Sequence, residues 1–174
     1  MIIVKTLPEN CRTDFLNFIQ NDDPNNVKFP IEYSSGSITK TSYYHNTYDS
    51  KLVDLYFKHF FNVIVKQFGQ NFSLKGIWYQ IYRKKSNSFH GYHDHTEHDG
   101  KLINSHISAV YYAKLQDTKL VTKFLVNGKE FQPDAKEGDL VLFDSRIKHM
   151  SPPNDTEHHK MIVSFNLNFG RYIS

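Results

Sequence analysis

Near its C-terminal end the chain reads Lys160-Met161-Ile162-Val163-Ser164-Phe165-Asn166-Leu167-Asn168-Phe169. The odd-numbered positions of this run are all apolar, whereas the even-numbered ones include a lysine, a serine and two asparagines. Because successive side chains of a β-strand point to opposite faces, the alternation predicts one long strand. We expect its apolar face to pack outward against helices and its other face to line an interior that contains polar groups.

The segments upstream of this strand have the same short period. Strands are expected at residues 76–82, 107–114, 119–126, 129–132 and 140–143. Asn127-Gly128 between two of them is a strong hairpin signal, and Gly138-Asp139 predicts a second turn. The C-terminal half therefore predicts a series of antiparallel strands.

The N-terminal part is helical in pattern. The clearest helix covers residues 49–68, where apolar side chains recur at helical spacing. Asp49 or Ser50 is expected to cap its start, and Gly69 to end it.

A shorter helix is expected to open at Pro8-Glu9-Asn10 and to run through Ile19. Residues 2–4 precede it as a short strand, and residues 21–26 follow it as a turn or loop.

Helices first and antiparallel strands afterwards predict an α+β domain built around a β-sandwich or barrel. A chain of 174 residues is long enough for one domain with a substantial core and short for two. We expect a single domain over residues 1–174, with a mostly helical support layer at 1–72 and a β-barrel core at 73–170.

The composition limits the classes of function. The net charge is only +3 and the basic residues are scattered, so nucleic-acid binding is not expected. The single cysteine, Cys11, cannot form an internal disulfide, which fits a reducing cytoplasm. No stretch approaches the roughly 20 apolar residues of a membrane span or the apolar region of a signal peptide. The sequence therefore predicts a soluble cytoplasmic protein without a membrane partner.

The histidines are concentrated in one segment: His90, His93, His95, His98 and His106 are half of all ten. In an extended segment, residues two apart point the same way, so His93 and His95 can face one point. The pair formed by His95 and Glu97 can do the same. Imidazole suits iron, zinc, copper and nickel, and a carboxylate favours oxygen-activating iron. Either pair predicts two ligands of a divalent metal ion, and a solvated histidine-rich loop is the alternative interpretation.

A third ligand must come from a distant segment. His149 is the natural candidate, because it follows the strand at 140–143 and a barrel can bring it to the first group. Lys160 lies on the interior face of the last strand, where a lysine is costly unless an anion pairs with it. These residues predict an acidic small molecule bound beside a metal ion.

Taken together, residues 78–169 resemble the 2-oxoglutarate- and Fe(II)-dependent oxygenases, in a prolyl-hydroxylase-like branch common in bacteria and tailed phages. The resemblance covers a little over half the chain, and its motifs are weak singly but specific as an ordered set. They are Phe89-His90-Gly91-Tyr92 with His93-x-His95, Ser108-Ala109-Val110-Tyr111-Tyr112, Gly138-Asp139-Leu140-Val141-Leu142-Phe143, His149, Pro152-Pro153-Asn154, Lys160 and Ser164-Phe165-Asn166.

The resemblance implies a double-stranded β-helix, that is, a jelly-roll or cupin-like barrel, supported by the N-terminal helices. It implies that His149 is the distal iron ligand and that Lys160 pairs with the distal carboxylate of 2-oxoglutarate, where many relatives use arginine. Tyr82 and Tyr112 match positions beside the co-substrate. Ser164 shares the face of Lys160 and is expected to add a hydrogen bond.

The proximal ligands are left open by the resemblance. The branch pattern assigns His93 and His95, which the flanking residues 89–92 favour. The commoner pattern of histidine and carboxylate assigns His95 and Glu97 instead, and the distance from Glu97 to the next strand also suits it. Because the usual triad has two histidines and one carboxylate, a three-histidine site departs from it.

The implied activity is that of an Fe(II)- and 2-oxoglutarate-dependent dioxygenase, a hydroxylase that consumes O2 and to which ascorbate is a common aid. Its substrate is not readable from the sequence; a protein or peptide residue such as proline is favoured over a small molecule by analogy of fold alone. One alternative is a cupin-like barrel whose three histidines bind metal without 2-oxoglutarate, which has no need of an interior Lys160. Another is a non-enzymatic viral interaction protein, located in the cytoplasm of the host cell.

Overall fold

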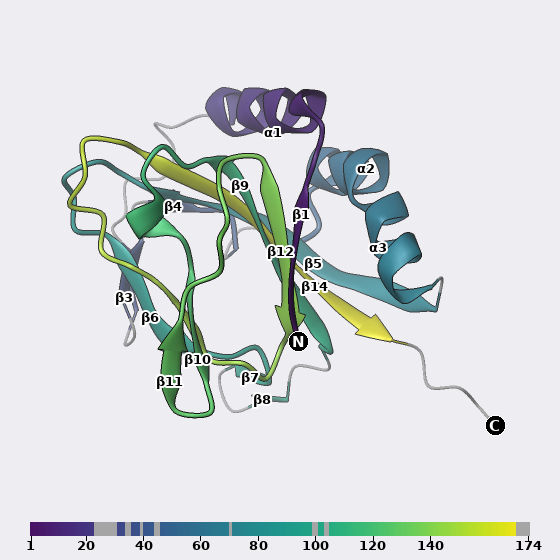
Figure 1. The fold of residues 1–174 in the computed structure, drawn as a ribbon. Helices are drawn as coiled ribbons and strands as arrows, with labels where there is room; N and C mark the ends of the chain where they lie inside the picture. Colours follow the sequence, from purple (N-terminus) through teal and green to yellow (C-terminus); the bar gives the residue numbers. More distant parts are fainter. Residues whose placement is uncertain are drawn as a thin grey trace.

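The computed structural model describes residues 1–22, 31–33, 36–38, 40–43, 46–69, 71–98, 101–102 and 105–169. Its strands form two six-stranded sheets that lie against each other, and its helices cover the outer side of one sheet (Figure 1). Most of the loop expected at residues 21–26 lies outside the described residues. Among the described residues, no helix has the length and apolar character needed to cross a bilayer.

Three helices form the supporting layer: α1 (Glu9–Asn21), α2 (Ser50–His59) and α3 (Phe61–Phe68). The Asp49 side chain accepts hydrogen bonds from the backbone N–H groups of Lys51 and Leu52, so it is the predicted N-cap of α2. Gly69, with φ +80°, ends α3 as expected.

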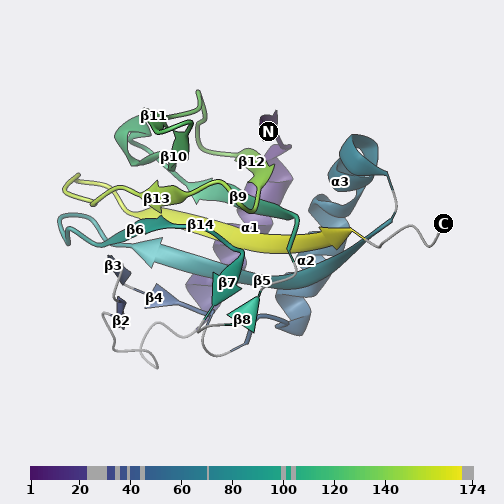
Figure 2. The same ribbon diagram turned by 90° about the horizontal axis from the view of Figure 1, so that it is seen from below.

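The sheet next to the helices, here called the major sheet, has the strand order β1-β12-β9-β14-β5-β4. Its strands are β1 (Ile2–Thr6), β12 (Asp139–Asp144), β9 (Ile107–Lys114), β14 (Lys160–Phe169), β5 (Phe72–Tyr82) and β4 (Lys40–Thr41). The long strands β14 and β5 run antiparallel over their whole length, which Figure 2 shows from below.

The opposite sheet, here called the minor sheet, has the order β11-β10-β13-β6-β3-β2. Its strands are β11 (Lys129–Phe131), β10 (Lys123–Val126), β13 (His149–Ser151), β6 (Phe89–His93), β3 (Gly36–Ile38) and β2 (Ile31–Tyr33). A separate pair, β7 (Glu97–His98) and β8 (Lys101–Leu102), lies beside it, and a short 3-10 helix, η1 (Thr118–Leu120), precedes β10. Two antiparallel sheets folded together in this way are the double-stranded β-helix that the sequence predicts.

The apolar core has two parts, divided by the major sheet. Between the helices and this sheet, Phe60 stacks on Phe15 and on Phe165, with ring centroids 4.9 and 5.2 Å apart. Between the two sheets, Phe124 packs edge-on against Phe143, with centroids 4.9 Å apart. The odd-numbered side chains of β14 lie in the first part of the core. The prediction that the apolar face of this strand packs against the helices is therefore confirmed.

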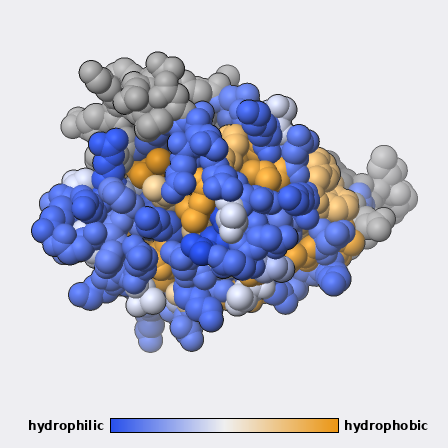
Figure 3. Space-filling model, turned by 90° about the horizontal axis from the view of Figure 1, so that it is seen from above, coloured by the Kyte–Doolittle hydropathy of each residue, from blue (hydrophilic) through white to orange (hydrophobic). Residues whose placement is uncertain are grey.

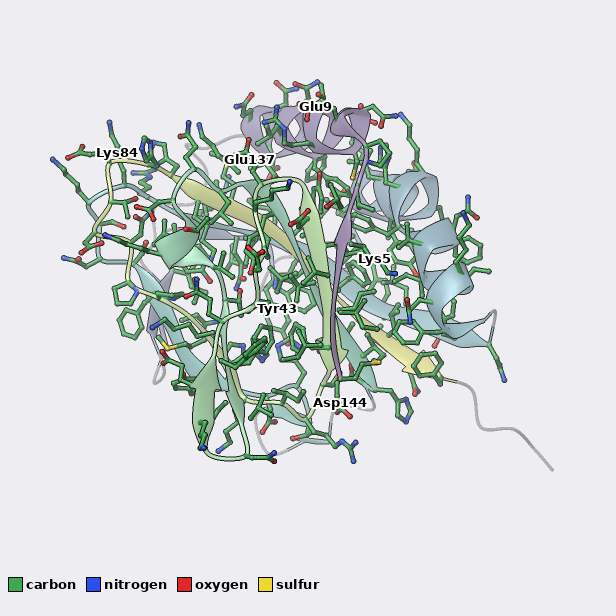
Figure 4. All side chains as sticks on the ribbon, viewed as in Figure 1. Lys5, Glu9, Tyr43, Lys84, Glu137 and Asp144 are labelled. Carbon is green, nitrogen blue, oxygen red and sulfur yellow. The ribbon has the colours of Figure 1, made fainter. Side chains whose placement is uncertain are left out.

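The outer surface above α1 is mainly hydrophilic, with apolar side chains visible between the polar ones (Figure 3). Arg12 of α1 pairs with Glu9 on its own helix, and its Nη1 lies 2.9 Å from Oε1 of Glu137. Figure 4 labels the two glutamates, Glu9 on α1 and Glu137 below that helix. The helical layer is thus attached to the sheet by this ion pair as well as by apolar packing.

The structure differs from the sequence-based expectation in three elements. The single helix expected at 49–68 is divided into α2 and α3 at Phe60, which is fully buried in the aromatic core. The segment at 119–126 begins in η1 rather than as a strand, and only Lys123–Val126 pairs. Residues 1–72 are not simply a helical layer, because β1 and β4 pair within the major sheet and β2 and β3 extend the minor one.

Candidate metal centre

Three histidines from separate parts of the chain converge between the sheets. His93 ends β6, His95 follows it, and His149 begins β13. One potential ligand atom from each lies within 4.8 Å of the others. His93 and His149 are direct partners in the ladder between β6 and β13, which explains how residues so distant in sequence meet. The structure therefore brings together the three histidines singled out in the sequence.

The Nδ1 atom of each of these rings lies at hydrogen-bond distance from an oxygen. The Nδ1 atom of His93 lies 2.7 Å from the carbonyl oxygen of Gly91, and that of His149 lies 3.0 Å from the carbonyl oxygen of Ile147. The Nδ1 atom of His95 lies 2.7 Å from Asn166 Oδ1. A carbonyl oxygen only accepts, so each Nδ1 carries the proton and each Nε2 keeps its lone pair. This is the tautomer that binds a divalent cation through Nε2.

Burial keeps the rings of His93 and His149 neutral. Desolvation lowers the pKa of His93, and it lowers that of His149 well below the ordinary value, with a further contribution from the neighbouring histidines. A neutral imidazole is the form that binds metal. Near neutral pH, few protons therefore have to leave these rings before a metal ion binds.

A fourth histidine, His90, lies beside this cluster. The ladder between β6 and β13 contains a β-bulge: His149 pairs with His93, but Ser151 pairs with His90. The extra residue lets His90 and His93 share one face, and their rings stack with centroids 3.7 Å apart. Strict alternation of strand residues assigns these two positions to opposite faces, so sequence reasoning missed His90.

The interior lysine is fully buried. Lys160 has 0% exposure, and its Nζ donates to the carbonyl oxygen of Leu120 at 2.6 Å and to Ser151 Oγ at 2.8 Å. Among the described residues, no carboxylate lies within ion-pair distance of it. Desolvation lowers the pKa of Lys160 from 10.5 to about 7. Lys160 is therefore an interior residue, as the alternation of the strand predicts.

Lys160 is connected to the histidines through one strand. Ser151, which accepts its hydrogen bond, lies two residues after His149 on β13. Residues two apart on a strand point the same way and are separated by about 7 Å. Ser151 thus links the Lys160 ammonium group to the strand that carries His149.

The two predicted tyrosines surround the ammonium group. The Lys160 Nζ lies 5.1 Å from the ring centroid of Tyr82 and 5.8 Å from that of Tyr112. The hydroxyl of Tyr112 also accepts a hydrogen bond from the backbone N–H of Thr122. Ser164 is buried farther along β14, opposite Trp78. Of the residues predicted to lie beside the co-substrate, Tyr82 and Tyr112 therefore adjoin Lys160, whereas Ser164 lies four residues farther along β14.

Aromatic side chains border the histidines on one side. The ring of Trp78 on β5 lies 6.0 Å from that of His95, and Tyr43 packs edge-on against Trp78 at 4.9 Å. Tyr43 is labelled in the region between the sheets in Figure 4. On the other side, Phe143 packs against His149 at 4.6 Å.

The backbone of Glu97, the alternative ligand, is in β7, and its side chain lies outside the described part of the structure. The assignment of His95 and Glu97 as proximal ligands stays a prediction, as does that of His93 and His95. The three nitrogen donors of the histidines suit iron, zinc, copper or nickel.

Comparison with solved structures identifies proteins with this fold. The α-ketoglutarate-dependent epimerase SnoN from nogalamycin biosynthesis superposes with a TM-score of 0.74 at 9% identity, over 95% of this chain and 76% of that one. HygX from Streptomyces hygroscopicus, with nickel and 2-oxoglutarate bound, gives 0.65 at 12% identity over 98% and 84%. A Trichoplax adhaerens prolyl hydroxylase, in complex with a hypoxia inducible factor peptide, gives 0.62 at 15% identity over 96% and 83%.

No protein-family model matches the sequence, and no curated protein is similar to it at a significant level. The structural similarity therefore concerns the fold: this chain has the double-stranded β-helix found in 2-oxoglutarate-dependent oxygenases.

Proposed function

We propose that the protein is an Fe(II)- and 2-oxoglutarate-dependent dioxygenase that hydroxylates its substrate. The observation that carries the proposal is Lys160, a cation buried between the sheets without a described carboxylate partner and one strand segment away from three converging histidines. Burying such a charge is costly, and an anionic ligand offsets the cost. A site for a metal and an anion, in a barrel shared with 2-oxoglutarate-dependent enzymes, suits this co-substrate.

In this proposal His93, His95 and His149 hold the iron through Nε2, and Lys160 binds the distal carboxylate of 2-oxoglutarate. Bound iron, 2-oxoglutarate and O2 supply the oxidation of a C–H bond, with release of CO2 and succinate. The chain itself orients the co-substrate, with Tyr82 and Tyr112 excluding water around the ammonium group. Lysine acts here as a point charge, without the bidentate geometry of arginine.

The proposed substrate is a protein or peptide residue such as proline. Trp78 and Tyr43 form an apolar wall beside His95, which suits a compact apolar group held near the metal. One protein of the same fold is a prolyl hydroxylase in complex with a peptide. A small molecule is the alternative, since SnoN has the same fold.

The test is turnover of 2-oxoglutarate by protein purified without oxygen. After addition of Fe(II), 2-oxoglutarate and ascorbate, oxygen is admitted and succinate is followed. We expect succinate from the wild type and from His158→Ala and Lys129→Ala, which change exposed residues. We expect none from His149→Ala or Lys160→Ala.

Because turnover can require the substrate, 2-oxoglutarate binding to the Mn(II) form is measured in parallel. Saturable binding that disappears in Lys160→Ala supports the proposal even without turnover. Absence of both binding and succinate contradicts it. The second candidate then stands: a cupin-like barrel that uses the three histidines for metal alone, a ligand set that among the described side chains consists of histidines.

A further inference from the structure

His95 has a hydrogen-bond environment unlike those of the other two histidines. His93 and His149 contact backbone carbonyl groups of nearby residues, whereas the Nδ1 atom of His95 lies 2.7 Å from the side-chain oxygen of Asn166. The Oγ atom of Ser108 lies 3.0 Å from the same nitrogen and donates to Asn166 Oδ1 at 2.8 Å. Asn166 is 7% exposed and Ser108 is fully buried. His95 is thus held by side chains that belong to the major sheet.

A chain of buried hydroxyl groups continues from this contact. Ser108 Oγ lies 2.9 Å from Ser145 Oγ, which lies 2.9 Å from Ser105 Oγ. Ser145 also accepts, through its backbone oxygen, the N–H group of His95 at 2.9 Å. The backbone and the ring of His95 are therefore fixed by one connected network, which joins β9, β14 and the turn after β12.

The direction of these hydrogen bonds determines the tautomer of His95. The oxygen of an asparagine amide only accepts, and Ser108 already donates its proton to it. The proton between His95 and Asn166 must therefore belong to Nδ1, which leaves Nε2 as a lone pair. If the amide were reversed, its NH2 group would face Nδ1 and the ring proton would lie on Nε2, where it would block metal binding.

We infer that Asn166 is a positioning residue: it fixes the ring and the tautomer of His95, so that His95 binds the metal together with His93 and His149. The inference rests on the proposed metal centre and adds a residue that does not touch the metal. A neutral amide keeps His95 a neutral ligand, so three imidazoles leave the charge of a divalent cation undiminished. Such a site favours a dianionic ligand, in agreement with the buried Lys160.

The test uses Asn166→Leu and Asn166→Asp. Leucine is similar in size but cannot accept a hydrogen bond, whereas aspartate keeps an acceptor at the same position. Asn168→Leu is the matched control, because Asn168 lies two residues along the same face of β14 and its Oδ1 has no partner among the described residues. Circular dichroism establishes that each variant is folded.

Two readouts are taken. The first is the affinity for Co(II), from calorimetry and from the visible bands of the bound ion. We expect Asn166→Leu to bind Co(II) about 10- to 100-fold more weakly, the usual effect of losing a contact to a metal-binding histidine. Asn168→Leu should remain close to the wild type, whereas Asn166→Asp should bind Co(II) at least as tightly, because a carboxylate accepts the same hydrogen bond and raises the basicity of the ring.

The second readout is the tautomer of His95 in the metal-free protein, from the side-chain ¹⁵N shifts of its ring. We expect the Nδ1–H form in the wild type and in Asn166→Asp, and a mixture in Asn166→Leu. An unchanged tautomer and unchanged Co(II) affinity in Asn166→Leu overturn the inference. A wild type that binds no Co(II) refutes the metal centre instead, while the tautomer measurement still reports on Asn166.

Discussion

Lys160 places an ammonium group where its solvation is incomplete. One backbone oxygen, one serine hydroxyl and the faces of two tyrosine rings replace the water that this charge would have at the surface. Desolvation accordingly lowers the pKa of Lys160 to about 7. A bound dianion favours the charged form, so the pKa is expected to rise in the complex.

The difference between the pKa of Lys160 in the free protein and in the complex predicts that 2-oxoglutarate binding is coupled to protonation of this lysine. Below pH 7 the lysine is already charged, and binding takes up no proton. Above pH 7 the free protein holds a neutral lysine, so binding takes up to one proton, and the affinity falls by up to about tenfold per pH unit. Calorimetry of the Mn(II) form in buffers of different ionisation enthalpy, at pH 6.5 and 8.5, measures the uptake.

The control for this prediction is Lys160→Met, which keeps the apolar stem without the charge. We expect weak, pH-independent binding of 2-oxoglutarate and unchanged affinity for Mn(II) in this variant. Equal proton uptake by the variant and the wild type would assign the coupling to another group.

Among the elements, β6 has the most influence on the site. Its bulge opposite β13 turns His90 toward the same interior as His93 and aligns it with Ser151, the partner of Lys160. His90 thus lies along the span from the metal ligands to the ammonium group. A co-substrate that reaches from the metal ligands to Lys160 therefore lies next to the ring of His90.

We therefore expect His90→Ala to weaken 2-oxoglutarate binding by about two- to tenfold, the range for one hydrogen bond. Mn(II) affinity should be unchanged, since His90 is outside the cluster of three. The dissociation constants of 2-oxoglutarate and of Mn(II) come from titration of the purified variant, with His158→Ala as the surface control. A large loss of Mn(II) affinity would instead make His90 a ligand.

The hairpin between β10 and β11 depends on its turn. Asn127 has φ +50° and Gly128 has φ +74°, so both are in the left-handed region that Asn-Gly turns adopt. Apart from the two neighbours of Gly128 in the chain, no atom of the described residues lies within 4 Å of a Cβ built on it, so a substitution there changes backbone strain without a clash.

Gly128→Val should lower the free energy of unfolding by about 1–2 kcal/mol, the cost of a left-handed conformation for a bulky residue. Gly128→Asn should cost less, because asparagine tolerates this region. Urea unfolding followed by circular dichroism measures both variants. Equal stability of wild type and Gly128→Val would show that the turn adopts another conformation.

At the scale of the whole molecule, the site joins the two sheets. His93 and His149 come from the minor sheet, whereas Asn166 and Lys160 come from β14 of the major sheet. A ligand bound to both sides stabilises the packing of one sheet on the other. Binding should therefore be detected as a change in global stability.

We expect Mn(II) at 100 times its dissociation constant to stabilise the protein by about 2.7 kcal/mol. For a chain of this size that corresponds to a Tm increase of roughly 5–10 °C. Differential scanning calorimetry should show the increase in the wild type, its reversal by EDTA and its absence in His149→Ala. An equal increase in that variant would indicate that the metal binds elsewhere.

Local sequence determined much of this protein. The strands at Ile107–Lys114 and Lys160–Phe169 have the predicted bounds, and Asp49 and Asn127-Gly128 cap and turn the chain as expected. These features depend on alternation, capping and turn chemistry, all of which act between residues close in sequence. The same alternation identified the interior Lys160, and the motif order identified the three histidines.

Only the tertiary structure decided the remaining features. The division of the helix at Phe60, the bulge that turns His90 inward and the contact of Asn166 with His95 all join residues far apart in the chain. In sequence, Asn166 is one polar residue in an alternating strand, and its role depends on a ring 71 residues away. Such contacts are set by how whole sheets and helices pack, so no local pattern of residue types encodes them.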